Sequence, residues 1–246
     1  MERINTLDLT GKIKIIQDTE KGSYTFDSVL LAYFTEFKKK DIQVVDLCTG
    51  NAPIALLLTL KKADLQIKAI EIQKEISLLG AKSIKLNNLE DKVQMINADL
   101  IKISDKIGKN CYDVITCNPP YFRVSESSKI NINDAVSIAR HELSVTLEDI
   151  IIEAKKLLSN VGTLNLVHRP DRLDEIIILL NNYGFTITKL QLVYPKIGRP
   201  ANTVLIEAKK SIIKNNKLRI LEPVFVFTEQ NEYTAQAQEI MKVTKS

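Results

Sequence analysis

The 246-residue sequence has few of the residues that build metal sites or disordered segments. Its two histidines, His141 and His168, are far apart, and the three cysteines form no C-x-x-C pair: Cys48, Cys111 and Cys117. We therefore expect no metal ion, and reduced, buried thiols of the kind found in cytoplasmic proteins. Glycine and proline are also scarce, with eight and seven residues, so a largely disordered chain is excluded.

Long apolar runs are missing too. No stretch reaches the roughly 18 apolar residues that a membrane helix needs, and the N-terminal residues lack the apolar core of a signal peptide. We expect a cytoplasmic protein without a membrane partner. Hydrophobic residues make up 45% of the chain, enough for one large α/β domain. The formal net charge of +4 permits a polyanionic partner but does not require one.

Short apolar runs alternate with helical patterns along most of the chain. Strands are expected at residues 42–46, 66–70, 93–96, 112–117, 162–167, 185–193 and 203–208, and helices at 29–37, 53–62, 74–87, 147–158 and 171–182. The joint between the last two strands holds no helix, so these strands should pair antiparallel. Residues 7–17 alternate around Gly11, which predicts a small hairpin covering one edge.

Four successive predicted strands end in a polar side chain: Asp46, Glu71, Asp99 and Asn118. Ligands of open α/β sheets bind at the carboxyl ends of the strands. The small-residue loop at 47–52, followed by a helix beginning at Pro53, would let backbone N–H groups approach a nucleotide-like ligand. Glu71 can accept hydrogen bonds from a ribose diol, and Asp99 from an adenine amino group. Each acid taken singly is equally well a solvated strand end, so the repetition is the stronger signal.

The tetrapeptide Asn118-Pro119-Pro120-Tyr121 follows the fourth strand directly. Two prolines fix a rigid turn. The side-chain oxygen of Asn118 and the carbonyl of Pro119 can accept hydrogen bonds from an amino group, and Tyr121 can stack on a flat ring. None of these residues is a strong base or nucleophile, so the chemistry requires an activated cosubstrate. A purely structural Asn-Pro turn is the alternative.

This N-P-P-Y turn resembles motif IV of amino-methyltransferases that use S-adenosylmethionine (AdoMet). Three further segments, Y-T-F-D-S-V-L-L-A, D-L-C-T-G-N and R-P-A-N-T-V-L-I-E-A-K-K, extend the likeness over roughly residues 5 to 210. In this order they resemble the tRNA adenine-N6 methyltransferases that modify the adenosine beside the anticodon of valine tRNA. The resemblance implies an α/β class I (Rossmann-like) fold with a seven-stranded, mostly parallel sheet, an antiparallel last strand and helices on both faces.

The same resemblance implies AdoMet as cosubstrate, S-adenosylhomocysteine as product, tRNA as partner and no metal. We expect a monomer with a methyltransferase domain at residues 1–210 and a small appendage at 211–246. By resemblance, AdoMet would be held by Tyr24, Thr25, Phe26, Asp27, Asp46, Gly50, Asn51, Glu71, Asp99 and Asn118. The catalytic residues would be Asn118, Pro119 and Tyr121.

Cys48 and Ala52 stand where many relatives have glycine, and a side chain disfavours positive φ. The loop should therefore use ordinary backbone angles at both positions, or bind AdoMet less tightly.

Cations that could contact tRNA are expected near strand ends, on the hairpin and in the stretch after the N-P-P-Y turn. The candidates are Lys14, Arg123, Arg169, Arg172, Lys196 and Arg199. Each is equally well an ordinary surface charge. The polar stretch 122–144 is too long for a simple turn, and we predict that it is a lid ordered by substrate.

Other acceptors stay open at this point. N-P-P-Y also occurs in enzymes that methylate glutamine in release factors, guanine in ribosomal RNA or adenine in DNA. The early first strand leaves no room for the helical domain of the glutamine enzymes, and the tail is short for a DNA-recognition domain. A non-catalytic RNA-binding module is a different class; the intact Asn118 and Tyr121 argue against it, and the altered glycine loop favours it.

Overall fold

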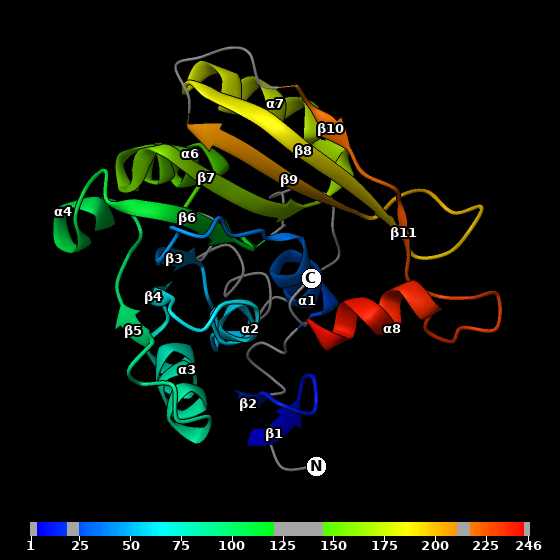
Figure 1. Ribbon diagram of the computed structural model, residues 1–246, viewed down its shortest axis with the longest axis horizontal. Helices are drawn as coiled ribbons and strands as arrows, with labels where there is room; N and C mark the ends of the chain where they lie inside the picture. The colour runs from blue at the N-terminus through cyan, green and yellow to red at the C-terminus, as the bar shows by residue number, and fades with distance from the viewer. Residues whose placement is uncertain (1–3, 19–24, 121–144, 211–216, 244–246) are drawn as a thin grey trace, which may run out of the picture.

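A single twisted sheet organises the computed structural model, which describes residues 4–18, 25–120, 145–210 and 217–243 (Figure 1). Its nine strands follow the order β10-β8-β9-β7-β6-β3-β4-β5, with β11 also paired to β8. The seven long strands are β3 (Gln43–Leu47), β4 (Gln66–Glu71), β5 (Val93–Asn97), β6 (Tyr112–Cys117), β7 (Leu158–His168), β8 (Phe185–Tyr194) and β9 (Thr203–Lys210). Two-residue strands β10 (Arg219–Ile220) and β11 (Val224–Phe225) complete it.

Helices cover both faces of this sheet. One face carries α1 (Phe26–Phe34), α2 (Pro53–Lys61), α3 (Lys74–Leu86) and α8 (Ala235–Lys242). The other carries α4 (Ile103–Ile107), α6 (Leu147–Leu157) and α7 (Leu173–Asn182), the last preceded by the short helix η1 (Pro170–Arg172). Figure 1 shows these two groups on opposite sides of the strands. The predicted α/β class with helices on both faces is confirmed.

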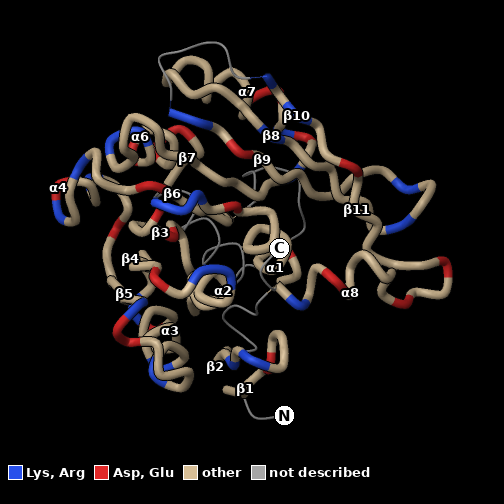
Figure 2. Tube along the Cα trace, in the orientation of Figure 1, with Lys and Arg blue, Asp and Glu red and all other residues tan. Residues whose placement is uncertain are grey.

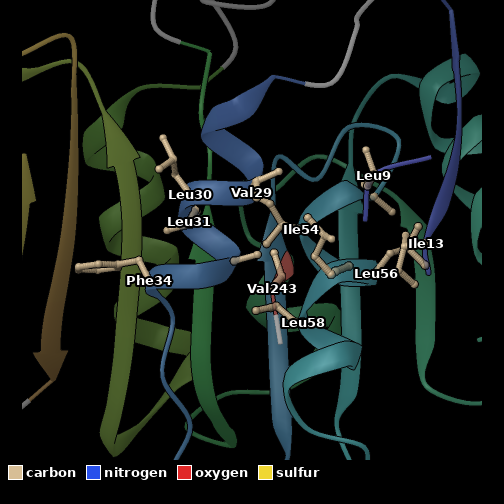
Figure 3. Close-up of a cluster of buried hydrophobic side chains, with 14 of the residues drawn as sticks. Leu9, Ile13, Val29, Leu30, Leu31, Phe34, Ile54, Leu56, Leu58 and Val243 are labelled. Carbon is tan, nitrogen blue, oxygen red and sulfur yellow. The ribbon is translucent and has the colours of Figure 1, made fainter. Parts of the chain in front are cut away.

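The first helix lies in the middle of the larger core. Its apolar residues are buried against α2 and against strands β7 and β9, and Figure 3 shows Val29 and Ile54 among the side chains of this cluster. Fully burying a side chain of this size stabilises the fold by about 1.5–3 kcal/mol. Pro53 opens α2 at the first helical position, where its fixed φ is favourable. This packing fixes where the N-terminal end of α1 lies.

Strand direction sets the position of the site. Strands β3 to β7 are mutually parallel, and β9 is antiparallel to both β7 and β8, as predicted for the last two long strands. Strands β7 and β8 therefore run the same way, and β11 runs parallel to β8. We call the side of the sheet where β3 to β8 end the carboxyl edge. It also receives the beginning of β9 and the N-terminal end of α1.

The N-terminal hairpin is confirmed. Strands β1 (Ile4–Asp8) and β2 (Lys14–Asp18) pair antiparallel around Gly11, whose φ of 74° suits glycine. The hairpin packs on α3, where Lys14 N donates to Asn87 Oδ1 and Ile16 N donates to Ser83 Oγ.

Several expectations need correction. The sheet has more than seven strands because residues 219–225 add β10 and β11 beside β8. The first helix ends at Phe34 rather than at residue 37, because Thr35 is extended and its hydroxyl turns back to donate to Leu31 O at 2.8 Å. The helix α4 was not predicted. Of the cysteines, only Cys117 is buried.

Among the described residues, no helix has the length and apolar character to cross a bilayer.

Candidate active site

The loop after β3 uses left-handed backbone angles at three of its positions. Cys48, Gly50 and Ala52 have φ of 54°, 60° and 70°. Of the two alternatives predicted for this loop, ordinary angles at Cys48 and Ala52 are therefore wrong, and weaker binding of AdoMet stays a prediction. Such a conformation is less stable by roughly 1–2 kcal/mol for a residue that has a side chain. Hydrogen bonds hold the loop in it, since Thr49 N donates to Ile70 O and Ala52 N donates to Thr49 O, each at 3.0 Å.

Asp46 lies beneath this loop and is completely buried. The hydroxyls of Thr49 and Thr116 donate to its two carboxylate oxygens, the second at 2.7 Å. Burial raises the pKa of Asp46 to about 7, although both hydroxyl bonds act in the opposite direction. Asp46 has no exposed surface, and its two hydroxyl partners join the loop, through Thr49, to β6, through Thr116.

Glu71, at the end of β4, joins the loop from the other side. Its Oε2 accepts a hydrogen bond from Gly50 N at 3.0 Å, and its Oε1 accepts one from Gln73 N at 2.9 Å. The carboxylate is thereby fixed at the wall of a cavity. A carboxylate oxygen has more than one acceptor direction, so further hydroxyl donors can still bind it.

The cavity has a volume of about 460 Å³, including the solvent at its mouth. It is lined by Cys48, Ile70, Glu71, Ile72, Gln73, Ala98, Leu100, Pro120 and Val145. Apolar side chains with one carboxylate suit a flat ring attached to a sugar. Asp99 lies between two lining residues, is exposed, and accepts a hydrogen bond from Ile101 N at 2.9 Å.

Asn118 directly follows the end of β6 and is not itself among the residues that line the cavity. Pro119 is buried, and Pro120 lines the cavity, so the turn separates the amide from the cavity wall. The Nδ2 group of Asn118 donates to Ser28 Oγ at 3.4 Å. Ser28 lies in the first turn of α1 and is 3% exposed. It is a site residue that the sequence did not single out, because only the packing of α1 on the sheet brings it to Asn118.

The residues around the start of α1 lie beyond Asn118. Thr25 is the N-cap of α1, and Asp27 Oδ1 accepts a hydrogen bond from Thr203 Oγ1 at 3.2 Å. Phe26 packs against the ring of Tyr233, with 5.8 Å between centroids. None of Thr25, Phe26 and Asp27 is among the cavity-lining residues of the described chain.

Asn51, a predicted AdoMet contact, joins two segments of the fold. Its Nδ2 donates to Ile16 O of the hairpin at 3.0 Å, so it ties the N-terminal hairpin to the loop after β3.

The predicted cations have mixed environments. Arg172 makes a two-pronged ion pair with Glu175, at 2.8 and 2.6 Å. Lys196 Nζ donates to Glu229 O at 3.2 Å. Exposed positions are held by Lys14, Arg169 and Arg199.

Three predicted site residues, Tyr24, Tyr121 and Arg123, lie outside the described residues, as does the predicted lid at 122–144.

Comparison with known proteins decides the family. The model of the methyltransferase small domain family matches residues 24–179. The chain belongs to this family. The resemblance to methyltransferases seen in the sequence is thereby confirmed, and the cavity and the N-P-P turn lie within the matched part of this methyltransferase.

Two curated relatives of this methyltransferase carry the same name, tRNA1(Val) (adenine(37)-N6)-methyltransferase. The protein of Flavobacterium psychrophilum is 26% identical over 238 residues, which are 95% of each chain. That of Trichodesmium erythraeum is 26% identical over 208 residues, covering 83% of this chain and 85% of the relative.

Solved structures agree on the fold of this methyltransferase. A predicted O-methyltransferase from Agrobacterium tumefaciens has a TM-score of 0.70 at 19% identity, covering 89% of this chain and 97% of its own. TYW2 from M. jannaschii, solved in complex with AdoMet, has a TM-score of 0.56 at 15% identity, covering 85% of this chain and 86% of its own.

Proposed function

We propose that this protein transfers a methyl group from AdoMet to the exocyclic amino group of an adenosine in tRNA. The substrate position is adenosine 37, beside the anticodon of valine tRNA, and the reaction takes place in the cytoplasm. The observation that carries the proposal is the side-chain amide of Asn118, which contacts Ser28 and directly precedes the Pro119-Pro120 turn, whose second proline lines an apolar cavity. The names of the two relatives support the same acceptor, and one of these relatives matches almost the whole chain.

The residues present fit AdoMet. The cavity wall is apolar at Ile70, Ile72 and Leu100, which suits an adenine ring, and Glu71 presents a fixed carboxylate for ribose hydroxyls. Asp99, next to two of the lining residues, would accept from the adenine amino group. The loop from Cys48 to Ala52 borders the cavity through Cys48. AdoMet, when bound here, supplies an electrophilic methyl group.

Asn118 and Pro119 would receive the amino group of the acceptor base. Because Nδ2 donates to Ser28, the amide of Asn118 is oriented with Oδ1 as its acceptor. Oδ1 and the carbonyl of Pro119 would accept the two amino hydrogens, align the nitrogen, and stabilise the positive charge that develops on it. The proton can then leave to water. Swinging an unpaired loop base out costs at most a few kcal/mol.

Replacing Asn118 tests this proposal. We expect Asn118→Ala to lower kcat by about 100-fold or more, because an acceptor of developing charge is lost. AdoMet affinity should change less than about three-fold, because the lining of the cavity is unchanged. The measurement is transfer of radiolabelled methyl into total tRNA, DNA and release factor, followed by mass analysis of the modified nucleosides.

Asn181→Ala on the exposed side of α7 is the matched control and should behave as wild type. Wild-type turnover in Asn118→Ala would overturn the mechanism. Label in DNA or release factor with none in tRNA would overturn the acceptor.

A further inference from the structure

Residues 217–243 hold a rigid, half-exposed tyrosine at the carboxyl edge. Tyr233 is 41% exposed and forms an antiparallel bridge with Phe227. The two rings are stacked, with 5.0 Å between centroids and 29° between planes. Thr234 follows at once as the N-cap of α8, donating from Oγ1 to Phe225 O at 2.6 Å. These contacts hold the ring of Tyr233 in one position within the fold.

This tyrosine stands close to the residues that hold Asn118. Its ring lies 5.8 Å from the ring of Phe26, the first residue of α1. Ser28, two residues further on, contacts the amide of Asn118. The first residues of α1 thus contact Tyr233 through Phe26 and Asn118 through Ser28.

The connection between β8 and β9, residues 195–202, borders the same region. It carries Lys196 and Arg199 and no acid. Lys196 Nζ donates to Glu229 O, which ties this connection to the segment before Tyr233. Figures 1 and 2 show both segments projecting from the same end of β8 and β11, with basic residues on the first and acidic residues on the second. Because Glu229 and Glu232 offset the charges of Lys196 and Arg199, this surface has little net charge. Its distinctive feature is the exposed ring of Tyr233.

We propose that Tyr233 is a stacking platform for an unpaired base next to the target adenosine of the RNA substrate. The inference rests on the proposed function, and it assigns a role in substrate binding to the C-terminal residues. A rigid ring loses little conformational freedom when a base stacks on it. Such stacking contributes about 1–3 kcal/mol per base, which corresponds to roughly 5- to 150-fold in affinity.

The test compares variants of the full chain. Tyr233→Leu keeps an apolar contact with Phe26 and Phe227 but removes the ring, Tyr233→Ala removes both, and Tyr233→Phe keeps the ring. Tyr33→Ala is the matched control, because Tyr33 is 39% exposed and lies at the other end of α1. RNA affinity is measured by fluorescence anisotropy with a labelled anticodon stem-loop of valine tRNA, without turnover. AdoMet affinity, kcat and the melting temperature are measured in parallel.

We expect Tyr233→Leu and Tyr233→Ala to weaken RNA binding by at least about five-fold, with AdoMet affinity and kcat at saturating RNA within about two-fold of wild type. Tyr233→Phe and Tyr33→Ala should bind RNA as wild type does. Equal RNA affinity in Tyr233→Leu and Tyr33→Ala would overturn the platform, as would a loss confined to AdoMet, or wild-type protein that does not bind the stem-loop. Wild-type protein that binds RNA but transfers no methyl to it would instead overturn the proposed function.

Discussion

Ser28 orients the group that we expect to receive the substrate. Its hydroxyl accepts a hydrogen bond from Asn118 Nδ2 at 3.4 Å, and removing it would hold the amide less firmly. We expect Ser28→Ala to lower kcat about ten-fold, because small misplacements of an aligned group are costly, while KM for tRNA and the affinity for AdoMet stay within about two-fold. Steady-state kinetics with both substrates measures this split.

Ser28→Thr, which keeps a hydroxyl, should recover much of kcat. Ser104→Ala is the control, since Ser104 is also buried and its Oγ has no partner within the described part of the chain. An unchanged kcat in Ser28→Ala would remove the positioning role.

Two buried titratable residues make opposite contributions to stability across the acidic range. Burial raises the pKa of Asp46 to about 7, so its contribution is full below pH 4 and is lost as the pH rises towards 7. Burial lowers the pKa of His168 to about 4, so its contribution is full above pH 6.5 and is lost as the pH falls towards 4. Each can change the free energy of unfolding by up to about 1.4 kcal/mol per pH unit.

In the wild type, the two residues change the free energy of unfolding with pH in opposite directions, so their effects offset each other. Single substitutions should separate the two effects. With Asp46→Asn, we expect the free energy of unfolding to rise with pH between 4 and 6.5, because the slope of His168 remains. With His168→Asn, we expect it to fall over the same range. Urea unfolding at half-unit pH steps measures both, and parallel profiles for the two variants would contradict the assignment.

At the scale of elements, we expect the left-handed angles of the loop after β3 to lower the free energy of unfolding rather than the affinity for AdoMet. Cys48 and Ala52 have left-handed angles in the folded loop, so we expect their strain to lower the stability of the fold itself. We expect Ala52→Gly to raise the free energy of unfolding by about 0.5–1 kcal/mol, less whatever the lost methyl contributes to packing. The affinity for AdoMet should stay within about two-fold, as measured by calorimetry.

Ala55→Gly is the control for this change. Ala55 is equally buried but lies inside α2, where glycine should destabilise by about 1 kcal/mol. If both variants destabilise the protein alike, the strain at Ala52 is not real.

The elements that the sequence predicts are those with local signals. A few consecutive residues are enough to recognise an apolar strand and the polar residue that ends it, such as Asp46, Glu71 or Asn118. The contacts that complete the site cannot be recognised from the sequence in this way. Ser28 and Asn118 are 90 residues apart, and Asp27 and Thr203 are 176 apart, so only the packing of α1 brings each pair together.

Local propensity also failed where tertiary bonds overruled it. Cys48 and Ala52 disfavour positive φ, but Glu71 and Ile70 hold the loop by its amides. Strand β10 has only two residues, too few for a periodic pattern, and it exists because β8 offers a partner.

At the scale of the whole molecule, tRNA binding should depend on salt through cations that are not already paired. We expect Arg199→Ala to weaken tRNA binding and to reduce the slope of log K against log salt by about 0.7–0.9, the loss of one phosphate contact. Arg172→Ala should leave the slope unchanged, because its guanidinium is held by Glu175. Binding titrations between low and moderate salt measure both slopes. A slope that is flat in the wild type would argue against an RNA substrate.

The short strands of the C-terminal residues have one more consequence. They lie along the outer side of β8, where Leu221 N donates to Leu190 O and Gln191 Nε2 donates to Glu222 O. A bare outermost strand offers its amides and carbonyls to any neighbouring molecule, which is a route to aggregation. Residues 219–225 cover the backbone amides and carbonyls of β8 and so protect the protein from aggregation. Truncating the C-terminal segment that contains Tyr233 would therefore leave β8 as an unpaired edge strand.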